Sequence, residues 1–203
     1  ETYTYDADGN ILTDLNQTWE ENDWLNSYRS TYTYNNDNGE WLTVLNQGWE
    51  NGEWLNYDFI TYTYDVNGNR LSGIYQSWNG SEWENYSSTV YTYTSSNNWS
   101  TITMLLWNGT DWDNNTKVEY DYSRGGKILA DAFTWTGSAW EPADWYIDFA
   151  LFNGGEQQYL YYGYAYSGEV AYSAINTGIV KPDLQNARFV AFPNPASDIL
   201  TIE

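Results

Sequence analysis

The stretch that decides the fold is residues 45–64, LNQGWENGEWLNYDFITYTY, in which Asn51-Gly52 separates two runs rich in Trp, Leu, Tyr and Thr. Asn-Gly between such runs is typical of a β-hairpin, because the tight turn needs two residues that adopt a positive φ. Trp49 and Trp54 lie equally far from this turn, so a hairpin would place them opposite each other. The stretch therefore predicts two antiparallel strands with a tryptophan pair near their tip.

The same pattern recurs along most of the chain. Tyr-x-Tyr motifs return at steps of 29 or 30 residues, beginning at Tyr3, Tyr32, Tyr62, Tyr91 and Tyr120. A Trp-x4-Trp pair keeps this period in five copies: Trp19/Trp24, Trp49/Trp54, Trp78/Trp83, Trp107/Trp112 and Trp135/Trp140. No segment shows the 3.6-residue apolar period of a helix. We expect an all-β fold, an antiparallel β-meander of two-strand repeats in an extended or curled sheet; the alternative is a closed β-barrel, which removes exposed edges.

This periodicity predicts four parts in the chain of 203 residues. Residues 1–141 hold five aromatic hairpin repeats, and residues 142–175, with a Tyr-rich run at 159–166, read as a divergent capping repeat. Residues 176–188 lack aromatic residues and read as a linker, and a distinct tail occupies residues 189–203. Because residue 1 already lies inside a Tyr/Thr strand pattern, we expect the sequence to be a piece of a longer protein.

Strict alternation of side chains predicts an aromatic face and a mostly polar face. Counting from Trp24, one face would carry Trp24, Asn26, Tyr28, Ser30, Tyr32 and Tyr34. The first strands would place Leu or Ile, Gln and Trp together, as Leu15/Gln17/Trp19, Leu45/Gln47/Trp49 and Ile74/Gln76/Trp78. We expect at least one tryptophan of each pair to be buried, since ten exposed ones would form an apolar patch far larger than soluble monomers show. The row is interpreted mainly as cross-strand packing and secondly as a platform for sugar rings, with the glutamines supplying hydrogen bonds.

Composition excludes several classes of function. The 28 acidic residues exceed the 7 basic ones, for a net charge of −21, and no basic cluster is present, so nucleic acid is not an expected partner. The absence of cysteine and histidine excludes disulfides, thiolate zinc sites, cysteine nucleophiles and histidine bases. Paired carboxylates remain as possible catalytic groups. They recur from copy to copy, however, whereas an active site normally occurs once in a protein; the residues concerned are Glu50, Glu53, Glu82, Glu84 and Asp111. We interpret them as solvated turn residues and expect no enzymatic activity.

Acidic turns between the repeats offer weak calcium candidates, namely Asp6, Asp8 and Asp65. A full calcium loop needs oxygen ligands at alternate positions and a distal bidentate Glu, which the first turn lacks. Asp and Asn also favour such turns without a metal, because their side chains hydrogen-bond the local backbone. No cofactor is therefore expected, with calcium as the alternative.

The tail reads Phe192-Pro193-Asn194-Pro195-Ala196-Ser197-Asp198 and continues as an alternating apolar strand to Ile202. It resembles the start of the C-terminal sorting domain of type IX secretion cargo from Bacteroidetes. The resemblance implies export across the outer membrane with a translocon and outer-membrane shuttle proteins as partners, and an extracellular or cell-surface location. The family's domain normally continues for several more strands, so the domain is expected to be truncated here.

The acidic turn Tyr64-Asp65-Val66-Asn67-Gly68-Asn69, like its counterpart at residues 5–10, is similar to the Tyr-Asp (Rhs-type) repeats, which build long antiparallel sheets on secreted proteins. In this chain the repeat is longer than in that family, and each repeat has an additional tryptophan pair. We expect a secreted or cell-surface repeat protein that acts as an adhesin or structural surface protein, with glycans or other surface proteins as partners. The alternative is a carbohydrate-binding module attached to a catalytic domain outside this chain.

Overall fold

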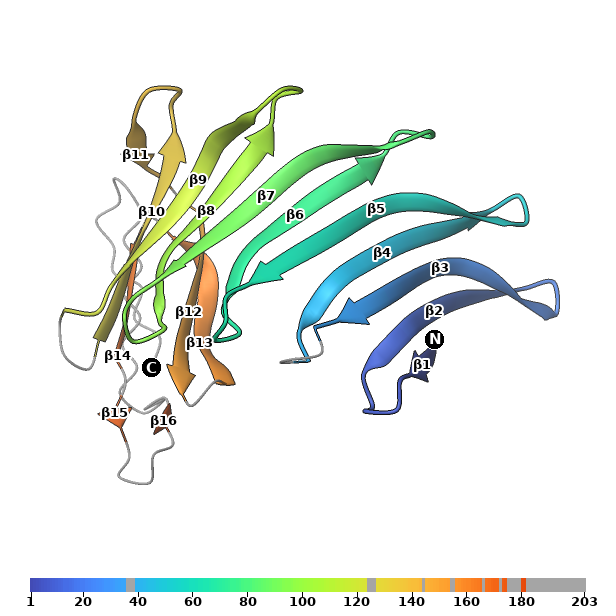
Figure 1. Ribbon diagram of the computed structural model, residues 1–203, viewed down its shortest axis with the longest axis horizontal. Coiled ribbons are helices and arrows are strands. Elements are labelled where there is room, and N and C mark those ends of the chain that lie inside the picture. The colour runs from blue at the N-terminus through green and yellow to red at the C-terminus, as the bar shows by residue number, and fades with distance from the viewer. Residues whose placement is uncertain are drawn as a thin grey trace. The chain divides into compact units, whose positions relative to one another are not determined.

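The computed structural model describes residues 1–35, 39–123, 127–143, 145–153, 156–165, 167–171, 173–174 and 180–181. These residues form strands and turns without a helix, as the hairpin pattern predicted, so no helix able to span a membrane occurs among them. Eleven strands, β1 to β11, follow one another in sequence order in a single antiparallel sheet (Figure 1). The alternative of a closed barrel is wrong, because among the described residues this path runs from β1 to β11 without closing on itself.

The strands of the meander are β1 (Thr2–Tyr5), β2 (Ile11–Glu20), β3 (Asp23–Tyr34), β4 (Trp41–Glu50), β5 (Glu53–Tyr64), β6 (Arg70–Trp78), β7 (Trp83–Tyr93), β8 (Trp99–Trp107), β9 (Trp112–Asp121), β10 (Lys127–Trp135) and β11 (Trp140–Pro142). Beyond them lie β12 (Trp145–Asn153), β13 (Glu156–Ala165), β14 (Ser167–Ala171), β15 (Ser173–Ala174) and β16 (Val180–Lys181). β14 joins the large sheet beside β10, β12 pairs with β13, and β15 pairs with β16. The Tyr-rich run falls mainly in β13; the sorting motif and most of the predicted linker lie outside the described residues.

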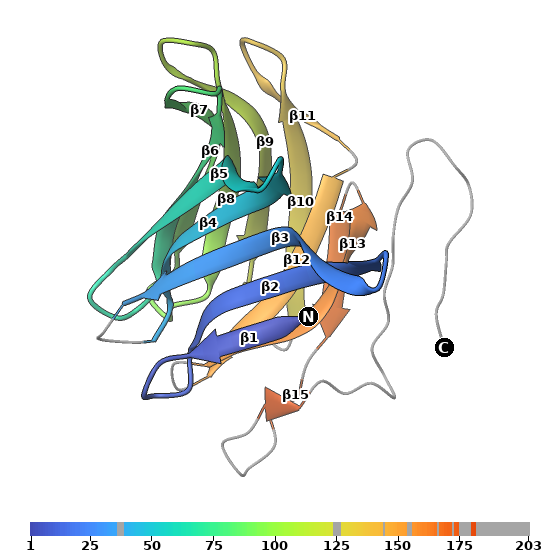
Figure 2. The ribbon, with the colours of Figure 1, turned by 90° about the vertical axis from the view of Figure 1, so that its right-hand side faces the viewer.

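Contacts divide the chain into two compact units, one of Glu1–Ser88 with Trp107–Asp111 and one of Thr89–Leu106 with Trp112–Glu203. In the first unit β1 to β5 lie side by side in sequence order (Figure 2). Its hairpin turns are as tight as predicted: Asn51 and Gly52 both have positive φ, of 52° and 87°. A tip at residues 79–82 also lies between Trp78 and Trp83, as the repeat predicts; a hydrogen bond of 3.1 Å from the Asn79 amide to the Glu82 carbonyl closes it.

A β-bulge interrupts the second strand of each of the first two hairpins. In the first, Gln17 pairs with Asn26 but Asn16 pairs with Tyr28, which leaves Ser27 as an extra residue. In the second hairpin Tyr57 is the extra residue, between Asn56 and Asp58. Such a bulge reverses the alternation of side chains beyond it.

The predicted aromatic face is therefore wrong beyond Asn26. Trp24 and Asn26 share a face with Trp19 and Gln17, which we call the tryptophan face. The tyrosines that follow the bulge lie on the opposite side, the tyrosine face, together with Ser30 and the equivalent residues of the next repeat: Tyr28, Tyr32, Asp58, Ile60 and Tyr62.

The second unit contains the core of the described residues. β10 contributes Ile128, Ala130 and Ala132, each at most 1% exposed, and β12 adds Ile147 at 1%. Trp99, Val118 and Tyr120 complete the cluster. The two small alanines let β12 approach β10 closely, so this part of the sheet buries its apolar face beneath a second layer.

Candidate functional site

The tips of the hairpins project beyond the continuous part of the sheet. β3 and β4 pair only as far as Tyr28 and Gly48, and β5 and β6 only as far as Asp58 and Ser77. The residues nearer each turn pair within their own hairpin, and the tips of the first unit fan apart (Figure 1). We call these tips fingers: finger 1 is residues 19–27, finger 2 is 49–57, finger 3 is 78–86, and residues 107–111 form the tip of finger 4.

Fingers 1, 2 and 3 each present a tryptophan pair on the tryptophan face. In fingers 1, 2 and 3 the two rings meet edge to face with centroids 5.2, 5.0 and 5.0 Å apart, and Trp135 and Trp140 of the second unit are 5.1 Å apart. The predicted pairing across the strands is confirmed for these four pairs. The expected burial of at least one tryptophan per pair is not found in these fingers. Trp19 and Trp24 of finger 1 are 56% and 57% exposed, and all four tryptophans of fingers 2 and 3 are half-buried.

A row of amide side chains lies below the tryptophans. The Nε2 of Gln17, Gln47 and Gln76 donates to the Oδ1 of the asparagine opposite it at 3.0, 2.9 and 3.0 Å. The three acceptors are Asn26, Asn56 and Asn85. The spacing predicted the glutamines beside the tryptophans and Asn26 on the face of Trp24, but not the hydrogen bond between the two amides, although Asn recurs at this position with the same period. Each finger thus joins flat apolar rings to fixed amide groups.

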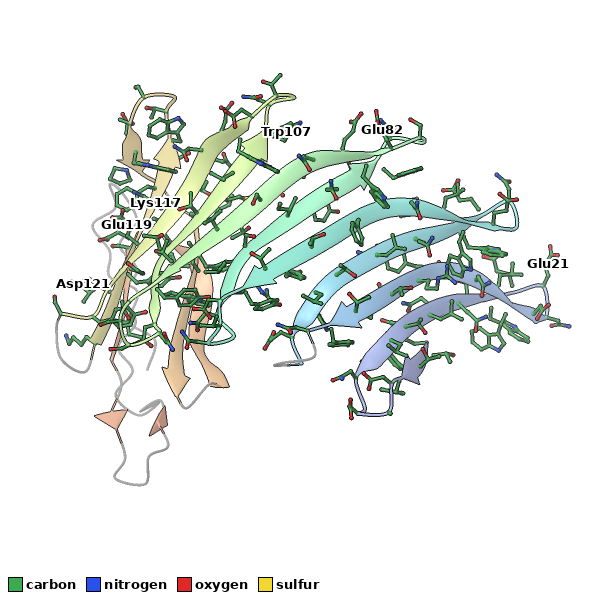
Figure 3. The ribbon with its side chains drawn as sticks, in the orientation of Figure 1. Glu21, Glu82, Trp107, Lys117, Glu119 and Asp121 are labelled. Atoms are coloured by element: carbon green, nitrogen blue, oxygen red, sulfur yellow. The ribbon has the colours of Figure 1, made fainter. Side chains whose placement is uncertain are left out.

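Between fingers 3 and 4 these groups surround a groove of about 450 Å³. Trp83 and Trp107 come from neighbouring hairpins of the first unit, and Figure 3 shows Trp107 and Glu82 at adjacent tips. The complete lining is Gln76, Glu82, Trp83, Glu84, Asn85, Trp107 and Gly109. Pockets that combine aromatic surface with a few fixed polar groups are typical ligand sites.

Asn79 orders the acidic rim of this groove. Its Oδ1 accepts hydrogen bonds from the backbone amides of Ser81 and Glu82, both at 2.9 Å, and its Nδ2 donates to Glu84 Oε1 at 2.6 Å. The lining holds two carboxylates and no basic side chain. The groove can therefore accept hydrogen bonds from hydroxyl or amino groups of a ligand and disfavours anionic groups.

In the acidic turns, the aspartate side chains accept hydrogen bonds from backbone amides of the same turn. Asp6 Oδ1 accepts from the backbone amides of Asp8 and Asn10, both at 2.9 Å, and Asp6 Oδ2 accepts from Asn10 Nδ2 at 2.9 Å. These bonds, led by that of the Asn10 side chain, lower the pKa of Asp6. Asp65 makes the equivalent bonds to Asn67 and Asn69. Within the described ranges no cluster of three or more metal-ligating side chains occurs.

A polar row on the tyrosine face was missed in the sequence because the bulge shifts its members. Ser30 Oγ donates to Asn46 Oδ1 at 2.7 Å, and Asn46 Nδ2 donates to Asp58 Oδ1 at 2.6 Å. Burial, followed by a hydrogen bond to Asp58, raises the pKa of Tyr75 to about 12. The row links β3 to β6 by side chains as well as by the backbone, so we assign it a structural role.

Comparisons with known proteins give structural likenesses only. No family model matches the chain, and no curated protein matches it. Among solved structures, a DUF3836 family protein from Bacteroides vulgatus shares 22% identity over 40% of this chain and 87% of its own, with a TM-score of 0.35. A protein of unknown function from Bacteroides fragilis shares 16% identity over 57% of this chain and 87% of its own, with a TM-score of 0.46.

A second DUF3836 family protein, from Parabacteroides distasonis, shares 19% identity over 38% of this chain and 77% of its own, with a TM-score of 0.30. The solved structures that this chain is similar to thus include DUF3836 family proteins of Bacteroidetes, and their descriptions name no activity.

Proposed function

We propose that this chain is part of a non-catalytic surface or secreted repeat protein that binds glycans through the tryptophan face. The groove between fingers 3 and 4 carries the proposal. Its two tryptophans offer flat apolar surfaces to the C–H faces of sugar rings, and Gln76 and Asn85 lie beside them with amide groups for ring hydroxyls. This combination suits sugars, because a sugar ring has apolar C–H faces and polar hydroxyl groups around its edge.

The expected ligands are neutral glycans. Two glutamates line the groove, and the chain carries a net charge of −21. Uronic-acid and sulfated polysaccharides would therefore be repelled at long range by the net charge and at the site by the glutamates. Neutral hexose polymers meet no such repulsion, and their hydroxyl groups can donate to Glu82 and Glu84.

Binding is tested by calorimetry against neutral and anionic oligosaccharides with the protein and its Trp107→Ala variant. We expect binding of neutral sugars only, and about tenfold weaker binding by the variant, since one aromatic contact is worth up to about 1.5 kcal/mol. Trp19→Ala, in an exposed pair outside the groove, is the matched control and should bind as the unmodified protein does. Absence of any binding, or equal effects of the two substitutions, would refute the groove as the glycan site.

Export by type IX secretion is the second part of the proposal and rests on the motif at residues 192–198. The translocon and outer-membrane shuttle proteins would then be its partners. Deleting residues 189–203 and whatever follows them should retain the protein in the periplasm, measured by fractionation and surface labelling. Deleting residues 176–188 instead removes the predicted linker but keeps the motif, so it should leave display intact; unchanged display of the first variant would contradict the proposal.

A further inference from the structure

The charges around the groove between fingers 3 and 4 are all of one sign. Glu82 and Glu84 line it and are exposed, and no basic side chain belongs to the lining. The amides of the lining are those of Gln76 and Asn85, and its rings are two indoles. Carboxylates and the faces of indole rings both attract positive charge. The groove therefore favours a ligand that brings a positive charge with it.

The first unit itself holds a cation on one of its tryptophan pairs. The Arg29 guanidinium carbon lies 4.4 Å from the ring centroid of Trp54 in finger 2. The same group donates to Gln47 Oε1, from Nε at 3.2 Å and from Nη2 at 2.5 Å. An indole ring and a glutamine oxygen thus bind one cation together, because the ring face attracts its charge and the oxygen accepts its N–H groups.

The second unit holds an ammonium group in a similar way, with a carboxylate added. Lys117 Nζ lies 4.7 Å from the ring centroid of Trp140 and 5.2 Å from that of Phe133. Glu119 Oε1 lies 2.6 Å from the same nitrogen, and the two side chains lie together in Figure 3. Lys117 therefore shows, within this chain, how a primary ammonium group is held by an aromatic ring and a carboxylate.

The groove contains the counterparts of the residues that bind the arginine in finger 2. Gln76 and Trp83 follow Gln47 and Trp54 by 29 residues. Phe59 pairs with Gln76 and packs on Trp83, with ring centroids 5.6 Å apart, but phenylalanine has no hydrogen-bond donor. No side chain of the described residues donates to Gln76 Oε1, whose orientation is fixed by its Nε2 bond. The lining thus combines indole rings, an amide oxygen and two carboxylates.

We propose that the groove between fingers 3 and 4 prefers glycans that carry a protonated amino group, that is, polymers of amino sugars. The inference rests on the proposed glycan binding and extends its ligands from neutral sugars to cationic ones. The sugar ring packs on the indoles of Trp83 and Trp107. The ammonium group, which has three N–H donors and no acceptor, donates to Glu82, Glu84 and Gln76 Oε1.

Calorimetry with three oligosaccharides of equal length and linkage tests this preference. The sugars differ in one substituent at the same ring carbon, which is a hydroxyl, an acetamido or an amino group. At a pH at which the amine is protonated, we expect the amino sugar to bind about tenfold more tightly than the other two. Glu82→Gln/Glu84→Gln removes both charges but keeps hydrogen-bond acceptors, so this variant should bind the amino and hydroxyl sugars equally.

The control must change the net charge equally at another tip, because the acidic chain attracts any cation at long range. Glu50→Gln/Glu53→Gln does so in finger 2, outside the groove, and should keep the preference for the amino sugar. Thermal unfolding shows whether both variants remain folded. A preference lost in both folded variants, or kept in both, would overturn the inference.

The unmodified protein alone also tests the inference, whatever the variants do. If it binds the three sugars equally, or the amino sugar least, the preference is refuted while glycan binding itself stands. If it binds none of the three, both the inference and the proposed function fail.

Discussion

Trp99→Ala is expected to destabilise the protein by about 3–5 kcal/mol, the usual range for removing a buried tryptophan. Trp99 is 5% exposed and packs within the core cluster of the second unit, with ring centroids 5.9 Å from Tyr120 and 6.4 Å from Tyr91. Alanine would remove these ring contacts and leave a cavity that the surrounding strands only partly fill. Urea unfolding of the full chain, followed by tryptophan fluorescence and circular dichroism, measures the loss.

Trp41 supplies the matched control, because it begins β4 as Trp99 begins β8. It also contacts a tyrosine, with centroids 5.3 Å apart from Tyr32, but it is 42% exposed. Trp41→Ala should therefore cost only the aromatic contact and partial burial, about 1–2 kcal/mol. Equal losses for the two variants would show that the cluster around Trp99 is not the core.

Ile128→Ala is expected to cost about 2–5 kcal/mol by the same mechanism. Ile128 is fully buried on β10 among Val118, Ala130 and Ile147, and it is one of the largest fully buried side chains of the described residues. Ile128→Val removes a single methylene and should cost about 0.5–1.5 kcal/mol. Chemical denaturation at constant pH would give both values from the transition midpoints.

Leu129→Ala tests whether the loss of stability is confined to side chains on one face of β10. Leu129 is the next residue, so it points to the opposite face, and it is half-buried. Its truncation should cost clearly less than that of Ile128. A Leu129 variant as unstable as Ile128→Ala would place the core on both faces of β10 and contradict the layer formed by β12.

Strand order and hairpin tips could be predicted because their signals are local. Asn51-Gly52 adopts the positive φ values of a tight turn, and the equal spacing of Trp49 and Trp54 about it fixes the pairing. Both signals repeat along the chain, so one hairpin recognised correctly predicts its neighbours. The meander follows from short connections between successive strands.

The faces could not be predicted because a bulge leaves no periodic signal. Ser27 and Tyr57 are ordinary strand residues, yet the extra residue moves Tyr28 to the side opposite Trp24. Counting by two across a long strand is reliable only where no residue is inserted. The single miscounted residue also hid the polar row that runs from Ser30 to Asp58.

The candidate site was predicted in part. The tryptophans and glutamines were recognised as neighbours from their spacing, but the equivalent places of Arg29 and Phe59 beside the next tryptophan pair were not. Arg29 and Phe59 differ in charge and size, and only their contacts with Trp54 and Trp83 show that they occupy equivalent places in successive repeats. Conversely, the core around Ile128 depends on β12, whose sequence departs from the repeat.

The meander also determines how the first unit would respond to mechanical load. Among the described residues, strands β2 to β6 are each hydrogen-bonded only to the strands that precede and follow them in the chain, and β1 only to β2. Tension applied at the N-terminus and at right angles to β1 would therefore act on the β1–β2 ladder one bond after another, like a zip, rather than on all bonds of the strand together. The strands would then peel away singly, each release lengthening the chain while the remaining hairpins stay folded, and the separate steps would appear in single-molecule stretching.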